Sequence, residues 1–323
     1  MSTQGRRGAE VSRFLEEMEW VTAPFTVSFL AAGEYNENYL VQTDAETLVF
    51  RINHGTQLGL DNQIGYEYIV LTLVAPSGVT PRPRRLCESH ELFPRGVLLM
   101  EYLPGRPLDY RIDLEGAAAC FARIHATDYD VATGELVTQA DPVGDIISEC
   151  EELLSRHPDH PLPEAGRKIR TYMEHVRELA RSSSFDGEAL CIVNTEVNSG
   201  NFLVNETHDA AEHAVRLVDW EKAVASVRYQ DLGHFLVPTT TLWKSDFRFD
   251  RANRERFLRR YYELAGPPVS FTELDRRTRV LEETILLRAF SWVYMAWAEY
   301  TSGARALSNQ DTFRTMESYL ERI

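Results

Sequence analysis

Apolar and polar residues alternate along three short segments near the start of the chain, a pattern typical of half-buried β-strands. The segments cover residues 25–30, 39–43 and 47–52. Turn-like residues separate them at 32–38 and 44–46. Because short connections usually join neighbouring antiparallel strands, the three segments predict an antiparallel meander.

A helix and a further strand are predicted in the rest of the first hundred residues. Apolar residues recur at helical spacing over residues 62–74, and the prolines and glycine at 76–83 end this pattern. A run at 97–103 that is apolar except for Glu101 is typical of a buried strand, and Pro104 and Gly105 stop it. This part of the chain therefore predicts mainly β structure with one helix.

Helical spacing dominates from about residue 113 onward, with short apolar segments that predict strands. The expected helices cover 113–125, 142–154, 165–180, 250–264 and 272–301, and the expected strands cover 189–193, 202–204 and 215–219. The whole pattern predicts an α+β fold of two lobes. The first is a small antiparallel β lobe with one helix over residues 1–103, and the second is a larger, mainly helical lobe over residues 104–323.

The composition is that of an ordinary globular protein, with 44% hydrophobic and 26% charged residues. No apolar stretch is long enough to cross a bilayer, and none follows Arg6 and Arg7, so we expect no membrane partner and no secretory signal. The four cysteines are scattered without a C-x-x-C pair, which favours a reducing, cytoplasmic compartment. A net charge of −15 argues against a nucleic-acid partner.

The candidate chemistry lies in two groups of residues, one at positions 196–219 and the other at positions 51 and 67. In the first, Glu196 is followed by four residues, then by Asn201 and a short apolar strand, and Asp219 lies fifteen residues past the end of that strand. This is the spacing of a kinase catalytic loop and its metal-binding Asp. The acid can accept a hydroxyl proton, and the Asn and Asp oxygens suit Mg²⁺, a hard cation.

These residues resemble the aminoglycoside phosphotransferase and choline kinase group, which are relatives of protein kinases, over roughly residues 25–300. The group usually shows H-G-D-x-x-x-x-N, and here Asn194, Thr195 and Glu196 stand at the first three positions while Asn201 is retained. The resemblance implies a protein-kinase-like fold and Mg²⁺-dependent transfer of the γ-phosphate of ATP. It implies Glu196 as the base, and Asn201 and Asp219 as metal ligands.

A cation should hold the phosphates of the nucleotide, and a helix Glu should hold that cation. The chain contains only three lysines, and none precedes Lys168. Arg51, inside the expected strand at 47–52, is therefore the candidate for this cation. Glu67, on the following helix, is its expected partner. A guanidinium suits this role because its planar fork can bond two phosphate oxygens at once.

The resemblance also implies where the rest of the nucleotide binds. The loop at 31–38, which contains Gly33, would cover the phosphates, although a simple hairpin loop explains the same residues. The backbone of Glu101 and Leu103, at the end of the apolar run, would meet adenine. A core strand followed by a turn explains this run equally well.

The function expected from these motifs is ATP-dependent phosphotransfer to a hydroxyl of a small molecule of the aminoglycoside, choline or sugar type. The alternative is a catalytically impaired, nucleotide-binding pseudokinase that acts as a regulator or scaffold, because Asn194 and Glu196 depart from the pattern. A protein kinase is disfavoured, since the stretch between Asp219 and Asp231 leaves little room for an activation segment. If Glu196 converges with Asn201 and Asp219, the enzyme is favoured; if it is buried in an ion pair elsewhere, the pseudokinase is favoured.

Overall fold

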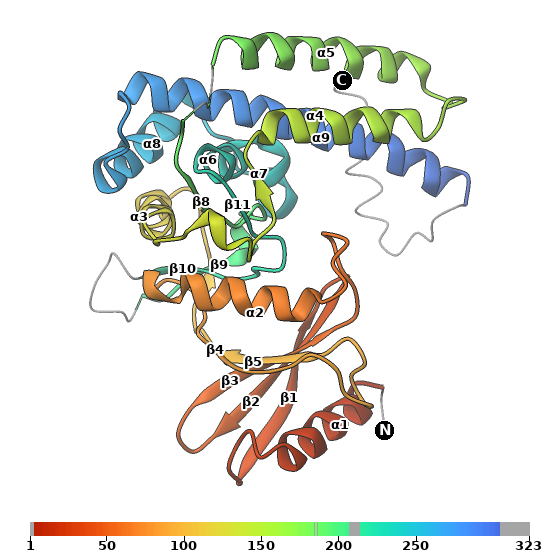
Figure 1. The fold of residues 1–323 in the computed structure, drawn as a ribbon, viewed down its shortest axis with the longest axis vertical. Helices are drawn as coiled ribbons and strands as arrows, with labels where there is room; N and C mark the ends of the chain where they lie inside the picture. The colour runs from red at the N-terminus through yellow and green to blue at the C-terminus, as the bar shows by residue number, and fades with distance from the viewer. Residues whose placement is uncertain (1–2, 184, 186, 207–213, 304–323) are drawn as a thin grey trace. The chain divides into compact units, whose positions relative to one another are not determined.

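The computed structural model describes residues 3–183, 185, 187–206 and 214–303 (Figure 1). These residues form two compact units. The first contains Met1–Thr138 and Asn194–Ala225, and the second contains Gln139–Val193 and Ser226–Ile323. The segment with Glu196, Asn201 and Asp219 thus belongs to the same unit as the N-terminal strands. The lobe boundary expected between residues 103 and 104 is a different division, and it stays a prediction.

An antiparallel five-stranded sheet with the order β1-β2-β3-β5-β4 forms the centre of the first unit. Its strands are β1 (Phe25–Ala32), β2 (Asn36–Thr43), β3 (Thr47–Asn53), β4 (Pro83–Cys87) and β5 (Val97–Glu101). The predicted meander is confirmed as β1-β2-β3. Strand β4 was not predicted, because its proline and its two arginines hide the apolar alternation of a strand.

Helix α1 (Thr3–Glu17) packs against β1 (Figure 1). Its buried residues Val11, Phe14 and Leu15 lie at helical spacing and join one core cluster with Phe50 and Phe93. The Phe14 and Phe50 rings meet edge to face with centroids 5.6 Å apart. This helix was not predicted, because four hydrophobic residues in fifteen give a weak periodic signal.

Helix α2 (Gln63–Val74) packs against β4 and β5. Its N-cap Asn62 accepts a hydrogen bond from the Gly65 N–H at 3.0 Å, which explains why the helix starts there. The elements that follow in this unit are η1 (Ala75–Ser77), β6 (Arg106–Pro107), α3 (Leu114–His125), η2 (Val131–Thr133), η3 (Ser199–Asn201), β9 (Phe202–Val204) and β10 (Val215–Leu217). In a small antiparallel sheet, β9 is the central strand and pairs with β10 on one side and with β6 on the other.

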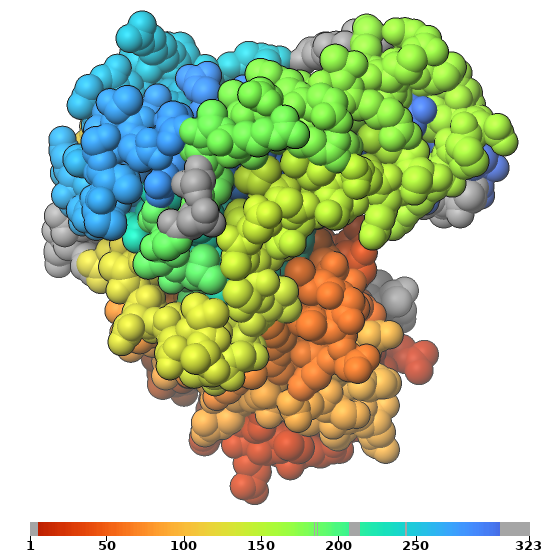
Figure 2. Space-filling view, turned by 45° about the horizontal axis from the view of Figure 1, so that its top comes forward, coloured from red at the N-terminus to blue at the C-terminus, as the bar shows by residue number. Residues whose placement is uncertain are grey.

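The second unit is helical. Its helices are α4 (Pro142–Ser155), α5 (Pro163–Arg181), α6 (Tyr229–Leu236), α7 (Pro238–Lys244), α8 (Arg251–Ala265) and α9 (Phe271–Thr301). The long helix α9 contacts each of the others, and Figure 2 shows the surfaces of α4 and α5 side by side. Strands β7 (Thr138–Gln139), β8 (Leu190–Val193) and β11 (Val224–Val227) lie where the chain passes between the units. The α+β class is confirmed.

No helix within the described part of the chain combines the length and the apolar character that crossing a membrane requires.

Candidate active site

The segment that precedes β9 is held in an unusual backbone conformation. Thr195 has a φ of 66°, in the left-handed region that a β-branched residue rarely adopts. Two contacts fix it: the Thr195 hydroxyl donates to the Lys222 carbonyl at 2.9 Å, and the Glu196 N–H donates to Asn194 Oδ1 at 3.0 Å. The Asn194 amide also donates to the Asp219 carbonyl at 2.8 Å. Asn194 therefore ties the two motif segments together.

Side chains of α2 hold the turn that follows β10 through hydrogen bonds. Asp219 has a φ of 65°, and Trp220 beside it is fully buried. Gln63 donates to the Glu221 carbonyl at 2.7 Å, and the Tyr66 hydroxyl donates to the Ala223 carbonyl at 2.6 Å. These contacts hold the turn so that the side chains of residues 219 and 221 face the same side.

Three carboxylates come together between these segments. Glu196, Asp219 and Glu221 each offer a carboxylate oxygen, and these oxygens all lie within 4.8 Å of one another. Burial raises the pKa of Glu221 to about 7, and the negative charges of Asp219 and Glu67 add to this shift. Carboxylates so close repel each other strongly unless a cation joins them. An oxygen set of this kind suits a hard divalent cation such as Mg²⁺.

Arg51 faces the cluster from β3. Its Nη1 atom lies 2.5 Å from Glu67 Oε1 and 3.1 Å from Asp219 Oδ1, and its Nε atom donates to Asn38 Oδ1 at 3.0 Å. Although burial alone would lower it, the neighbouring Glu67 and Asp219 charges raise the pKa of Arg51, so it stays protonated. The expected pairing of Arg51 with Glu67 is present in the structure.

The charges at this place do not balance. Four carboxylates meet two cationic side chains, which leaves two negative charges when all groups are ionised. The carboxylates are those of Glu67, Glu196, Asp219 and Glu221, and the cations are Arg51 and Lys222, all among the described residues. One divalent cation would neutralise this excess. The donor set therefore fits Mg²⁺ in both chemistry and charge.

Asn201 joins the same group through the backbone. Its side-chain amide nitrogen donates to the Glu196 backbone carbonyl at 2.7 Å, and the Asn201 backbone carbonyl accepts from the Val218 N–H at 2.9 Å. The amide nitrogen is thus engaged, and the amide oxygen has no hydrogen bond within the described ranges of the chain. This oxygen is the atom that the sequence predicted as a metal ligand.

The remaining predicted residues have no described contact with the carboxylates. Gly33 lies in the turn between β1 and β2, where its N–H donates to the Asn36 carbonyl at 2.9 Å. Glu101 ends β5, and its N–H donates to the Arg82 carbonyl at 2.9 Å. Leu103 follows and is 4% exposed.

Sequence reasoning did not single out several residues that complete this group. Glu221 was not predicted as a site residue, yet its carboxylate accepts from Gln57 Nε2 at 2.7 Å and from the Asn36 amide. Lys222 was counted among the lysines, yet its Nζ atom lies 3.3 Å from Glu196 Oε1. Their position next to Asp219 in the chain was the available signal.

The arrangement of Glu196 bears on the choice between the enzyme and the pseudokinase. Glu196 pairs with Lys222, but it does so within the group formed by Asp219 and Glu221, and Asn201 binds its backbone. The carboxylate is also not sealed off, since a quarter of the side chain is exposed. Convergence of these groups is the arrangement that favours the enzyme.

A family model described as "Phosphotransferase enzyme family" matches residues 26–275. The chain belongs to this phosphotransferase family. A search among curated proteins finds no match. The resemblance that the catalytic-loop motif implied is thus confirmed.

Solved structures of other phosphotransferases share the fold of this family member. A putative aminoglycoside phosphotransferase from Ralstonia eutropha is 16% identical with a TM-score of 0.71, covering 97% of this chain and 95% of that chain. Spectinomycin phosphotransferase, solved with ADP and spectinomycin, is 12% identical with a TM-score of 0.63, covering 96% and 93%. A choline/ethanolamine kinase family protein from Mesorhizobium loti is 16% identical with a TM-score of 0.62, covering 97% and 92%. The kinase-like fold is therefore confirmed.

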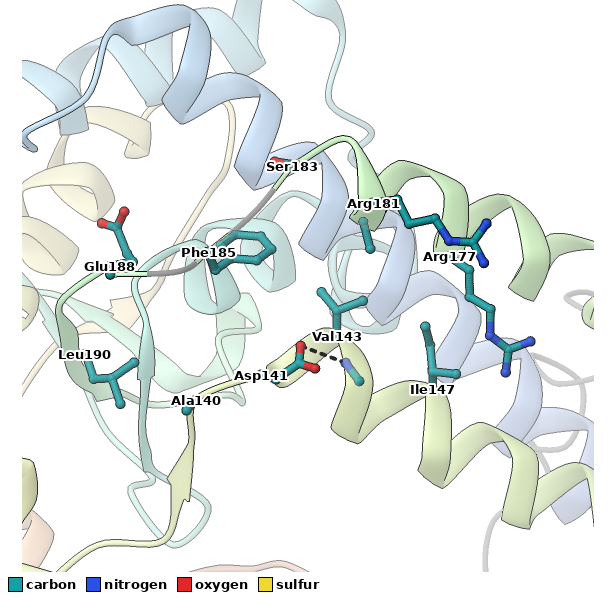
Figure 3. Close-up of a pocket in the computed structure, with 13 residues that line it drawn as sticks. Ala140, Asp141, Val143, Ile147, Arg177, Arg181, Ser183, Phe185, Glu188 and Leu190 are labelled. Atoms are coloured by element: carbon teal, nitrogen blue, oxygen red, sulfur yellow. Dashed lines mark hydrogen bonds between the residues drawn. The ribbon is translucent and has the colours of Figure 1, made fainter.

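A separate cavity of about 730 Å³ lies in the second unit of this phosphotransferase family member. Its walls come from the start of α4, the end of α5 and the segment before β8 (Figure 3). Asp141 accepts from the Gly144 N–H at 3.0 Å and so caps α4, while Glu188 pairs with Arg277. None of the residues predicted for the site lines this cavity.

Removing the Arg51 side chain should destabilise the protein strongly. In Arg51→Ala, the Glu67 carboxylate, which is 2% exposed, loses its buried partner. We expect the free energy of unfolding to fall by about 3–5 kcal/mol, as when one partner of a buried ion pair is deleted. The matched control is Arg84→Ala, which breaks an exposed pair with Glu46 and should cost about 0–1 kcal/mol. Equal losses in urea unfolding would contradict the buried pair.

Proposed function

We propose that this chain is a Mg²⁺-dependent phosphotransferase that moves the γ-phosphoryl group of ATP to a hydroxyl of a small molecule. The observation that carries the proposal is the convergence of the Glu196, Asp219 and Glu221 carboxylates beside Arg51. Phosphoryl transfer depends mostly on positioning and on charge stabilisation. This group of residues supplies carboxylates that can hold a metal ion and a guanidinium that can bind phosphate. Membership of the phosphotransferase family agrees with it.

In the proposed reaction, the acceptor oxygen forms a bond to the γ-phosphorus while the bond from that phosphorus to the oxygen shared with the β-phosphate breaks. ADP leaves with the electron pair of the broken bond. Glu196 takes the proton of the acceptor hydroxyl, as a positioned carboxylate can. Asn201 and Asp219 would hold Mg²⁺, which supplies positive charge to the phosphate oxygens when it is bound.

The nucleotide would be held mainly by residues of an N-terminal lobe over 1–103, and the acceptor by a C-terminal lobe over 104–323. Arg51 would bond the α- and β-phosphates, with Glu67 keeping its guanidinium in place. The turn at Gly33 would cover the phosphates. Because the Glu101 N–H already donates within the sheet, its carbonyl and the Leu103 N–H are the groups proposed to meet adenine.

We expect the acceptor to be an aminoglycoside-, choline- or sugar-like alcohol that is cationic or neutral. Relatives of this fold are described as acting with spectinomycin and as choline or ethanolamine kinases. A net charge of −15 also favours cationic over anionic small molecules at low salt. The four cysteines all lie in the described part of the chain and none of them forms a disulfide there, in agreement with the cytoplasmic location that we propose.

A screen for ADP release tests this proposal. The purified chain is incubated with ATP and Mg²⁺ and a panel of aminoglycosides, choline, ethanolamine, other amino alcohols and sugars. We expect acceptor-dependent ADP release that excess chelator abolishes and that added Mg²⁺ restores. Nucleotide binding without release for any acceptor would reject the enzyme and support the pseudokinase. Faster turnover of phosphorylated or carboxylated acceptors would reject the acceptor class.

A further inference from the structure

We propose that Lys222 is a positioning residue of the phosphoryl-transfer reaction, which holds the Glu196 carboxylate where the acceptor hydroxyl delivers its proton. The inference rests on the proposed function. Lys222 Nζ lies 3.3 Å from Glu196 Oε1, and the two side chains are 15% and 25% exposed. Within the described part of the chain, this ammonium is the one group that pairs with the Glu196 carboxylate.

A glutamate at this place needs such a partner more than an aspartate would. Its side chain has one more rotatable bond, so the carboxylate samples more positions unless a contact fixes it. Misplacement of a catalytic group by about 1 Å can cost on the order of a hundredfold in rate. In addition, the nearby Asp219 and Glu221 carboxylates repel Glu196, and the Lys222 ammonium opposes that repulsion.

Lys222 is itself well placed to do this. Its carbonyl accepts from the Thr195 hydroxyl at 2.9 Å, so the residues before Glu196 and the residue that pairs with it are fixed to each other. The backbone of Glu196 is fixed independently, through Asn194 Oδ1 at 3.0 Å and the Asn201 amide at 2.7 Å. What Lys222 adds is control of the carboxylate alone.

The chain also uses lysine sparingly, with three lysines against 31 arginines. An ammonium is compact and a guanidinium is a wide planar fork, so the two do not fit one site equally. We therefore expect that Lys222→Arg restores only part of what Lys222→Met removes. A purely structural role for Lys222 would not predict that kcat decreases in the order wild type, Lys222→Arg, Lys222→Met.

The first test measures rates of ATP hydrolysis and of transfer to the best acceptor. Lys222→Met should lower kcat by about 10–100-fold, the usual effect of a misplaced catalytic group. The KM for ATP and the unfolding midpoint should change little, because none of the proposed nucleotide contacts is removed. The kcat of Lys222→Arg should lie between those of the wild type and Lys222→Met. Lys168→Met and Lys244→Met, at exposed positions, are the matched controls and should keep the wild-type rate.

The second test is a double-mutant cycle with Glu196→Asp. Shortening the arm breaks the pair with Lys222, so Glu196→Asp should cost much more in the wild-type background than in Lys222→Met. Additive losses, or a wild-type kcat in Lys222→Met, would overturn the inference while leaving the proposed function intact. A wild-type protein that transfers phosphate to no acceptor would instead reject the proposed function, and the inference with it.

Discussion

Asp219→Asn is expected to reduce turnover by about 10³-fold or more, which corresponds to a loss of about 4 kcal/mol of transition-state stabilisation. The substitution keeps the size of the side chain and removes one negative charge from the group that is proposed to hold Mg²⁺. Because Asp219 also lies 3.1 Å from Arg51, the change weakens the ion pair between a proposed metal ligand and the side chain proposed to bind the phosphates. The rate should not recover at high Mg²⁺ concentration, since the lost charge also orients Arg51.

The matched control for this experiment is Asp44→Asn, the same chemical change in an exposed turn of the same unit. It should leave kcat and KM at their wild-type values. Removal of the Asp219 charge relieves repulsion within the carboxylate cluster, so the free energy of unfolding should not fall greatly. Wild-type turnover in Asp219→Asn would sink the metal-site assignment.

Glu196→Gln is expected to lower kcat by about 10²–10⁴-fold, the usual contribution of a general base. Glutamine keeps the length of the arm but cannot take the proton of the acceptor hydroxyl. It also cannot form an ion pair with Lys222, which now stands 3.3 Å from the carboxylate. Affinity for ATP, measured by calorimetry with a non-hydrolysable analogue, should change little, because the proposed nucleotide contacts come from other residues.

Glu135→Gln, at an exposed position outside the cluster, serves as the control and should behave as the wild type. A Glu196→Gln protein with the wild-type kcat refutes the proposed base. A loss of ATP affinity that matches the loss of kcat would instead assign Glu196 to nucleotide binding.

Much of the fold could be predicted from periodicity, and the failures have identifiable causes. The meander β1-β2-β3 and the helix α2 follow regular apolar patterns, and both are present. Helix α6, which begins at Tyr229, was not predicted, because Gly233 in its middle weakens the helical pattern. This glycine is required by packing, since a Cβ there would lie 2.7 Å from the Glu282 backbone nitrogen of α9. Tertiary contact, which the sequence does not display, decides that element.

Part of the candidate site could likewise be predicted from the sequence, and part of it could not. The spacing of Glu196, Asn201 and Asp219 is local information, and the structure brings these residues together. The contact of Asn36 with Glu221 joins residues 185 positions apart, and no local pattern marks it. The approach of Lys222 to Glu196 depends on two loops whose left-handed residues, Thr195 and Asp219, are not glycines. Neither loop conformation could be predicted from residue preferences.

The decisive measurement for the proposed phosphotransferase is transfer of the label from γ-labelled ATP to an acceptor. The wild type, Asp219→Asn and Glu196→Gln are incubated with Mg²⁺, labelled ATP and the acceptor that releases most ADP. We expect the wild type to place the labelled phosphoryl group on an acceptor hydroxyl, which mass spectrometry of the product identifies. We expect both variants to do so at least about a hundredfold more slowly. Equal labelling by all three proteins, or ATP bound by the wild type with no label reaching any acceptor, would contradict the proposed function.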